Sequence, residues 1–325
     1  MVPTKQLGKT NLEVSRMGLG LAALGRPGYI NLGHEQDFIA RDKEAMARQS
    51  HSVLDEAYAL GIRYFDAARS YGLAERFLAG WLDTKMPLSV VVGSKWGYTY
   101  TANWQLSAEQ HEVKEHSLSN LNKQWQESTD ILGDWLELYQ IHSATLESGV
   151  LSNQEVLARL FELKQTGVAI GLSLSGTNQA ATLEQALTIT LQGERLFDTV
   201  QASFNLFERS AASILEQAHR EGIGVIIKEA LANGRLTARN QENEVQTLLE
   251  AAMRLETSPD ALALAWVLHH DWVDTVLSGA ATKTQLASNL KAFDLKLNEE
   301  TLKRLGELEQ APESYWQKRA GLCWN

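Results

Sequence analysis

The chain has 325 residues, of which 44% are apolar and 22% are charged, and its formal net charge is −10. This acidic balance argues against nucleic acid or an anionic membrane surface as the main partner, since both require a concentrated basic face. Cys323 is the single cysteine, which excludes an intrachain disulfide and a multi-thiolate metal site. No stretch has the character of a signal peptide or a membrane span, so we expect a soluble cytoplasmic protein.

Short strand-like runs alternate with helical patterns along the chain. After a first strand near 17–21 and a helix near 53–60, strands are expected near 63–66, 88–95, 135–142, 168–175, 199–204, 224–228 and 275–278. Helices are expected near 74–83, 108–126, 153–165, 179–191, 210–221, 243–255 and 283–293, with an additional helix at 259–270. Because parallel strands need long crossover connections, this alternation predicts an α/β protein with a parallel sheet.

Eight strand–helix units in series, without a low-complexity linker, favour a closed (β/α)8 TIM barrel that forms a single domain over residues 1–325. An open, doubly wound sheet is the alternative. A helical segment at 298–310 and an aromatic tail at 315–324 follow the last unit. We expect this C-terminal extension to pack near the mouth of the barrel.

Four polar side chains are expected at the carboxyl ends of neighbouring strands, where barrels assemble active sites. Asp66 ends the second strand, Lys95 the third and His142 the fourth, and Tyr71 lies in the loop after Asp66. A tyrosine has an ordinary pKa near 10, so it needs a nearby ammonium to become more acidic, and Asp66 is placed to keep Lys95 charged. His142 would then hydrogen-bond the substrate oxygen or share the proton with Tyr71, and Tyr71 is predicted to donate a proton to a carbonyl oxygen.

The same residues lie in segments that occur in a known order in one enzyme family. These segments are residues 61–75, Gly93-Ser94-Lys95, Tyr139-Gln140-Ile141-His142, Ile170-Gly171-Leu172-Ser173, Gln201-Ala202-Ser203-Phe204-Asn205, and Gly279-Ala280 through Gln285-Leu286 to Asn289-Leu290. With them the chain resembles an aldo-keto reductase over nearly its whole length. The resemblance implies hydride transfer between C4 of a nicotinamide cofactor and an aldehyde, ketone or sugar lactol, with Tyr71 as general acid or base and Asp66, Lys95 and His142 in support.

The resemblance also implies cofactor contacts. Ser173 and Gln201 match positions that bind the nicotinamide carboxamide. Gln285 and Asn289 match positions near the adenosine phosphate and the adenine, and Gly279 precedes them as a further candidate cofactor contact. Many members of the family bind the 2′-phosphate of NADP with basic residues near the positions of Gly279-Ala280 and Gln285, and these basic residues are missing here. We expect NADP(H) as the cofactor because it is usual in the family that the chain resembles, with NAD(H) as the alternative.

Two positions depart from the family pattern. Leu174 stands where an asparagine is usual, so one carboxamide partner is missing or replaced by a neighbour such as Ser175. Lys228 stands where an aromatic ring usually stacks on the nicotinamide, and it is expected to pair with Glu229 or to reach the phosphates. Within this segment we take Lys228 and Leu231 as candidate cofactor contacts.

Trp96 and Tyr98 follow the third strand and are the candidate contacts to a small carbonyl or sugar substrate, and we expect no metal site. Two other functions stay open. The barrel could serve as a cofactor-binding regulatory or scaffold subunit, although that function does not require the four polar residues. It could also be an isomerase or aldolase that uses Lys95 as a Schiff-base amine. The oligomeric state stays open as well.

Overall fold

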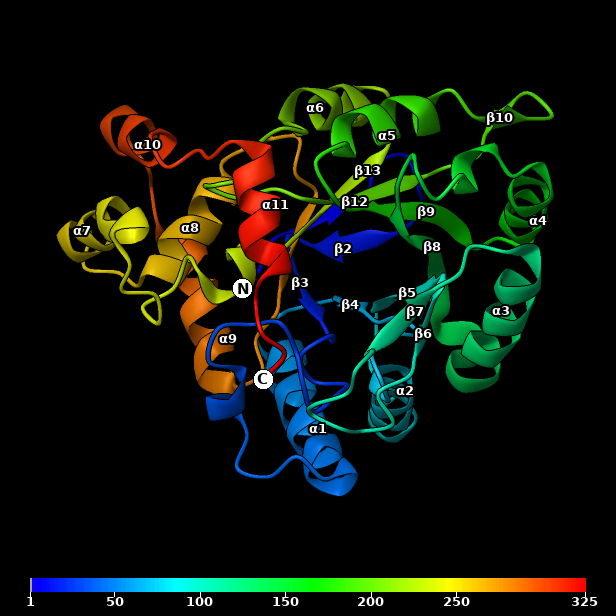
Figure 1. Ribbon diagram of the computed structural model, residues 1–325, viewed down its shortest axis with the longest axis horizontal. Helices are drawn as coiled ribbons and strands as arrows, with labels where there is room; N and C mark the ends of the chain where they lie inside the picture. Colours follow the sequence, from blue (N-terminus) through cyan, green and yellow to red (C-terminus); the bar gives the residue numbers. More distant parts are fainter. Residues whose placement is uncertain (1) are drawn as a thin grey trace.

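The computed structural model describes residues 2–325, and over this range eight parallel strands close into a barrel (Figure 1). Its strands, in chain order, are β3 (Met17–Gly20), β4 (Tyr64–Asp66), β5 (Val91–Trp96), β8 (Leu136–Ala144), β9 (Ala169–Leu174), β12 (Thr199–Ser203), β13 (Gly224–Lys228) and β14 (Thr275–Ser278). Sequential strands are neighbours, and β14 pairs with β3 to close the ring. The predicted (β/α)8 barrel is therefore confirmed, and the open-sheet alternative is excluded.

Helices surround the barrel and connect its strands. They are α1 (Lys43–Ala59), α2 (Ala74–Lys85), α3 (Leu118–Leu132), α4 (Gln154–Lys164), α5 (Gln179–Leu187), α6 (Ala212–Arg220), α7 (Gln246–Arg254), α8 (Pro259–Leu268) and α9 (Lys283–Leu290). Several begin at a side chain that accepts a hydrogen bond from the first turn, which satisfies an otherwise unpaired amide. These capping residues are Asp42, Ser117, Asn153, Ser258 and Thr282. Within residues 2–325, none of the helices combines the length and the apolar character that crossing a bilayer demands.

A short N-terminal hairpin closes the amino end of the barrel. Its strands β1 (Thr4–Gln6) and β2 (Glu13–Ser15) are antiparallel. Leu7 and Val14 are fully buried and pack against a small cluster of barrel side chains: Tyr64, Val91, Leu138 and Ile226. Because apolar side chains close this end, the carboxyl end is the side from which a ligand can reach the barrel interior.

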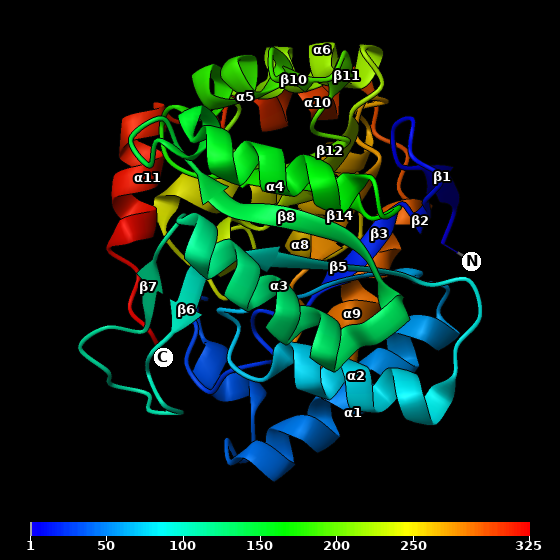
Figure 2. The same cartoon turned by 90° about the vertical axis from the view of Figure 1, so that its right-hand side faces the viewer.

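The carboxyl end is partly covered by a second hairpin, at the end of the barrel opposite β1 and β2 (Figure 2). Its strands are β6 (Tyr98–Tyr100) and β7 (Glu112–Lys114). The predicted helix at 108–126 is therefore wrong over its first half, because cross-strand backbone bonds form there and Ser117 caps a helix that starts only at Leu118. A third hairpin, β10 (Thr190–Leu191) with β11 (Glu194–Arg195), likewise follows α5, which ends earlier than predicted.

The C-terminal extension packs at the mouth, as expected. Helices α10 (Glu299–Gly306) and α11 (Pro312–Ala320) follow the last barrel unit, and α11 leads into the terminal segment over the barrel (Figure 1). Tyr29 and Asn325 exchange two backbone hydrogen bonds of 3.2 Å, so the end of the chain is tied to the loop after β3. The tail thereby contributes to the walls of the cleft described next.

Candidate active site

The centre of the site is an ion pair buried beneath the mouth of the barrel. Lys95 on β5 pairs through Nζ with the Asp66 carboxylate at the end of the adjacent strand β4, and it also donates to the Ala67 carbonyl oxygen at 2.9 Å. Lys95 is fully buried, and Asp66 is 1% exposed. Removing two charges from water is costly, so such a pair persists only when each partner is well hydrogen-bonded.

Asp66 meets that condition. Its Oδ1 accepts hydrogen bonds from Tyr64 Oη at 2.9 Å, Gln201 Nε2 at 3.0 Å and Gln140 Nε2 at 3.3 Å. These donors come from three different strands. The barrel therefore fixes the position of the carboxylate and, through it, of the Lys95 ammonium.

Tyr71 lies in the turn after β4, directly above this pair. The Lys95 Nζ lies 4.9 Å from the centroid of the Tyr71 ring, and the His142 ring meets it edge-on with centroids 5.4 Å apart. Burial, and then the charge of Asp66, raise the pKa of Tyr71 well above its ordinary value, and Arg26 opposes this rise. In the free protein, burial and the Asp66 carboxylate therefore outweigh the lowering of the Tyr71 pKa that was expected from Lys95.

His142 is held neutral. Burial, and then the charges of Lys95 and Lys228, lower its pKa well below the usual range. Its Nδ1 lies 3.4 Å from Ser70 Oγ. A neutral imidazole next to a protonated phenol presents two hydrogen-bond donors to a substrate oxygen, which is the arrangement that polarises a carbonyl group.

These residues open onto a cleft of about 540 Å³ at the mouth. The predicted site residues that line it are Asp66, Tyr71, His142, Gln201, Lys228, Leu231, Gly279, Gln285 and Asn289. Lys95 lies behind the lining, bonded to Asp66. Ser173 is also buried, and its hydroxyl accepts a hydrogen bond from the Ser143 amide at 2.8 Å, so it stabilises the carboxyl end of β8.

Gln285 and Asn289 lie at the end of the cleft formed by α9. The Gln285 amide donates to the Asp37 carboxylate at 2.8 Å, and Asp37 also forms an ion pair with Arg239. The Asn289 amide donates to the Asp260 carboxylate at 2.8 Å. Two carboxylates and one guanidinium therefore surround the positions expected near the adenosine.

Lys228 forms the predicted contact with Glu229, at 3.8 Å, and donates from Nζ to Ser203 Oγ at 2.8 Å. Glu229 in turn is bound by Arg319 of α11 through two nitrogens, at 2.6 and 2.9 Å. Although burial raises the pKa of Glu229, Arg319 and Lys228 lower it to about 2. The role of Arg319 was missed because it lies 90 residues from its partner, and no sequence pattern links the two.

Arg26 is a second residue that sequence reasoning missed. It is 3% exposed, lines the cleft and donates from Nη1 to Glu112 Oε2 at 2.9 Å. Its guanidinium carbon lies 5.3 Å from the Tyr71 ring centroid and 4.7 Å from that of Trp324. The only signal for it was the turn-forming sequence Gly25-Arg26-Pro27-Gly28 after the first strand.

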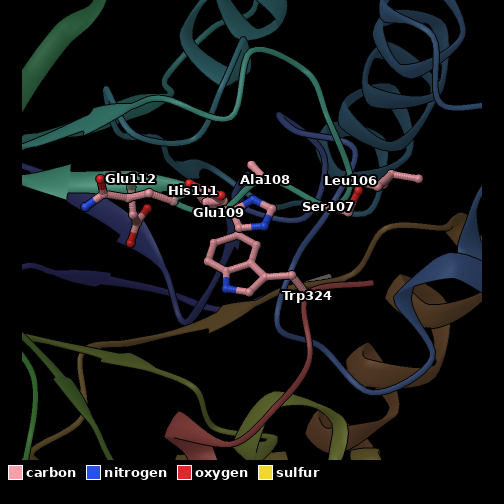
Figure 3. Close-up of a pocket in the computed structure, with 8 residues that line it drawn as sticks. Leu106, Ser107, Ala108, Glu109, His111, Glu112 and Trp324 are labelled. Carbon is pink, nitrogen blue, oxygen red and sulfur yellow. The ribbon is translucent and has the colours of Figure 1, made fainter.

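A side pocket adjoins the cleft at Glu112 and Trp324, which line both. The indole of Trp324 stacks on the His111 imidazole with centroids 4.0 Å apart and planes 3° apart (Figure 3). The remaining lining comes from the loop between β6 and β7, at Leu106 to Gln110. Trp324 therefore separates the catalytic cleft from the outer pocket.

Trp96 and Tyr98, the two aromatic candidates for substrate contact, lie next to the cleft but are not among the residues that line it. Trp96 is fully buried, and its ring centroid lies 5.5 Å from that of His116. Tyr98 is partly buried, with its ring centroid 5.0 Å from that of His142. Besides Tyr71, the aromatic side chains Tyr29 and Trp324 do line the cleft.

The side chains of the cleft fit a nicotinamide dinucleotide. Gln201 offers an amide at the catalytic end, and a Cβ added at Gly279 would meet no atom within 4 Å, so the chain leaves room for a ligand there. Lys228, Arg239 and Arg319 also line the cleft, so cationic groups of the kind that can bind phosphates are present. Among the described residues, three or more His, Cys, Asp or Glu side chains do not gather at any point where they could hold a metal ion.

Comparisons with known proteins show the family and the fold of the chain. A sequence model of the aldo/keto reductase family matches residues 16–310. The uncharacterized oxidoreductase YqkF of Bacillus subtilis is 25% identical, over 93% of this chain and 94% of its own length. The NADH-specific methylglyoxal reductase of Escherichia coli is also 25% identical, over 94% of this chain and 98% of its own. The holo form of the aldo-keto reductase AKR11C1 from Bacillus halodurans shares the fold, with a TM-score of 0.74 and 23% identity over 96% of this chain and 97% of that one.

Proposed function

Because the chain belongs to the aldo/keto reductase family and is an NAD(P)H-dependent oxidoreductase, we propose that it reduces a small aldehyde, ketone or sugar lactol with Tyr71 as the proton donor. One observation carries this proposal. The buried Lys95–Asp66 pair, the Tyr71 ring above it and the His142 ring at its edge converge on a single cleft. Carbonyl reduction is the chemistry that this combination serves.

A bound nicotinamide supplies the hydride. Tyr71 and His142 hold the carbonyl oxygen, and His142 donates a hydrogen bond as a neutral imidazole. Because its pKa is raised, Tyr71 carries its proton until negative charge develops on the substrate oxygen, and it then transfers that proton. The phenolate that remains lies near the cations of Lys95 and Arg26, which stabilise it. In the oxidative direction the same phenolate acts as the base.

Aldo-keto reductases use NADP(H) or NAD(H). For this chain we assign the cofactor contacts to Gln201, Gly279, Gln285, Asn289, Leu231 and Lys228 in the cleft, with Ser173 supporting it from behind. Substrate is assigned to the side of the cleft near Tyr98, with Trp96 in the layer beneath. Because Arg319 and Trp324 of the C-terminal extension line the cleft, we propose that the chain forms a single domain.

The other functions have less support. A scaffold subunit has no need of a buried, fully hydrogen-bonded Asp66 beside Lys95, so the intact set favours catalysis. A Schiff base on Lys95 requires a free amine in contact with substrate, whereas this amine is fully buried and bonded to Asp66 and Ala67. The methylglyoxal reductase among the relatives supports a small carbonyl compound as substrate.

The proposal is tested by Tyr71→Phe. We expect reduction of every accepted carbonyl to fall by about 100-fold or more, because a positioned proton donor contributes at least that much. Binding of reduced cofactor, followed by fluorescence, is expected to stay within about twofold, since the ring is retained. Tyr58→Phe on α1 is the matched control and should leave both quantities unchanged. Undiminished reduction by Tyr71→Phe would exclude this role.

A further inference from the structure

Lys228 lies at the mouth of the barrel, and it shares its neighbouring carboxylate, Glu229, with Arg319. It ends β13, its side chain is 15% exposed, and its Nζ donates to the neutral Ser203 hydroxyl at 2.8 Å. The nearest Glu229 oxygen is 3.8 Å away, beyond hydrogen-bond distance, and that carboxylate is already bound by Arg319. The ammonium therefore keeps donors free toward the cleft that it lines.

At the catalytic end of the mouth, the charged side chains of residues 2–325 leave one cation in excess; at the α9 end, Arg239 pairs with Asp37, and Asp260 accepts a hydrogen bond from Asn289. Three oppositely charged pairs each cancel, and Lys228 is left over as the additional charge. The pairs are Asp66 with Lys95, Glu112 with Arg26, and Glu229 with Arg319. Since these groups are shielded from bulk water, the unbalanced charge acts over a longer range than it would at a surface.

The charge of Lys228 reaches the reacting groups. After burial and Lys95, Lys228 is the next contribution that lowers the pKa of His142. A nicotinamide ring that delivers hydride to a carbonyl held at His142 and Tyr71 must lie within about 3.5 Å of that carbonyl. Lys228 lines the same cleft as Tyr71 and His142, so a ring bound there lies in the field of its charge.

We propose that Lys228 makes the site discriminate between the two redox forms of the cofactor, binding the reduced form more tightly and so favouring carbonyl reduction. The inference rests on the proposed function. The two forms differ at the ring: the oxidised nicotinamide is a cation, and the reduced one is neutral. Lys228 therefore repels the oxidised ring while leaving the reduced ring unaffected. After hydride transfer the same repulsion promotes release of the spent cofactor.

The discrimination depends on pH, because the charge of Lys228 titrates. Burial lowers its pKa to about 8, against the favourable charge of Glu229. The other charged groups that act on it are Arg319 of α11, Lys95 of β5 and Asp66 of β4. Lys228 is thus charged near neutral pH and loses its charge as the pH rises through about 8. The preference for reduced cofactor is expected to weaken over the same range.

The test measures dissociation constants for the reduced and oxidised forms of the preferred dinucleotide by calorimetry. In Lys228→Met the affinity for the oxidised form is expected to rise relative to the reduced form by about tenfold, equivalent to about 30 mV in the potential of the bound two-electron couple. Lys228→Arg keeps the charge and is expected to keep the wild-type ratio. Circular dichroism confirms that both variants are folded.

A second measurement needs no substitution. In the wild type, the affinity for the reduced form divided by that for the oxidised form should decrease as the pH rises from about 6.5 to about 9.5. If Lys228→Met keeps the wild-type ratio of the two affinities, the inference is overturned and the proposed function stays intact. An equal loss of affinity for both forms, as expected of a phosphate contact, is one such result. Failure of the wild type to bind either form would overturn both.

Discussion

The ion pair between Glu229 and Arg319 is expected to anchor the C-terminal helix to the barrel. The perturbation is Arg319→Met, which keeps most of the side-chain volume and removes the guanidinium. Glu229 has a side chain only 8% exposed, and its pKa is lowered from 4.5 to about 2. At about 1.4 kcal/mol per pKa unit, this corresponds to about 3 kcal/mol of folding free energy at neutral pH. Lys228 remains nearby, so we expect a loss of about 2 to 3 kcal/mol.

The pH dependence of this loss follows from the sign of the shift. A carboxyl group whose pKa is lowered in the folded state stabilises the protein above its unfolded pKa, and this contribution disappears as the pH falls through the folded value. The difference between wild type and Arg319→Met should therefore be full at pH 7 and should shrink between about pH 4.5 and pH 2.

Urea unfolding at several pH values measures both effects. Lys318→Met is the matched control, since Lys318 is the adjacent residue of α11 and pairs with Glu244 from a side chain that is 51% exposed. Such an exposed pair is worth about 1 kcal/mol or less. If Arg319→Met were no more destabilising at pH 7 than Lys318→Met, or if its cost persisted unchanged in acid, the reasoning from the buried carboxylate would be wrong.

Three further outcomes are expected. Lys95→Met leaves Asp66 charged and buried without its cation, so we expect about 3 kcal/mol of destabilisation in urea and a reduction rate lower by about 100-fold or more; an active, stable variant would contradict this. Trp324→Ala removes the indole between Arg26 and His111, and the KM for carbonyl substrate should rise about fivefold while the Kd for reduced cofactor stays unchanged; a shift in Kd instead would place Trp324 at the cofactor. Asp37→Asn removes a carboxylate next to Gln285 and frees Arg239, so fluorescence titration should show NADPH gaining about tenfold in affinity relative to NADH; an unchanged ratio would place the 2′-phosphate elsewhere.

The sequence by itself determined the barrel and the identity of its central residues. Strand and helix periodicities are local properties, and the carboxyl ends of parallel strands meet at one mouth. Asp66, Lys95 and His142 could therefore be placed together before their distances were known. The contact between Lys228 and Glu229 was also predictable, because the two residues are adjacent in the chain.

Only the tertiary structure decided what depends on contacts between distant segments. The hairpin of β6 and β7 replaced a predicted helix because its two strands pair with each other and cover the mouth. Arg319 meets Glu229 because α11 folds back over the barrel, and Arg26 meets Glu112 across 86 residues. The raised pKa of Tyr71 is likewise set by burial, which no local pattern records. Long-range pairing and desolvation depend on the whole packed chain, so they appear only when the fold is complete.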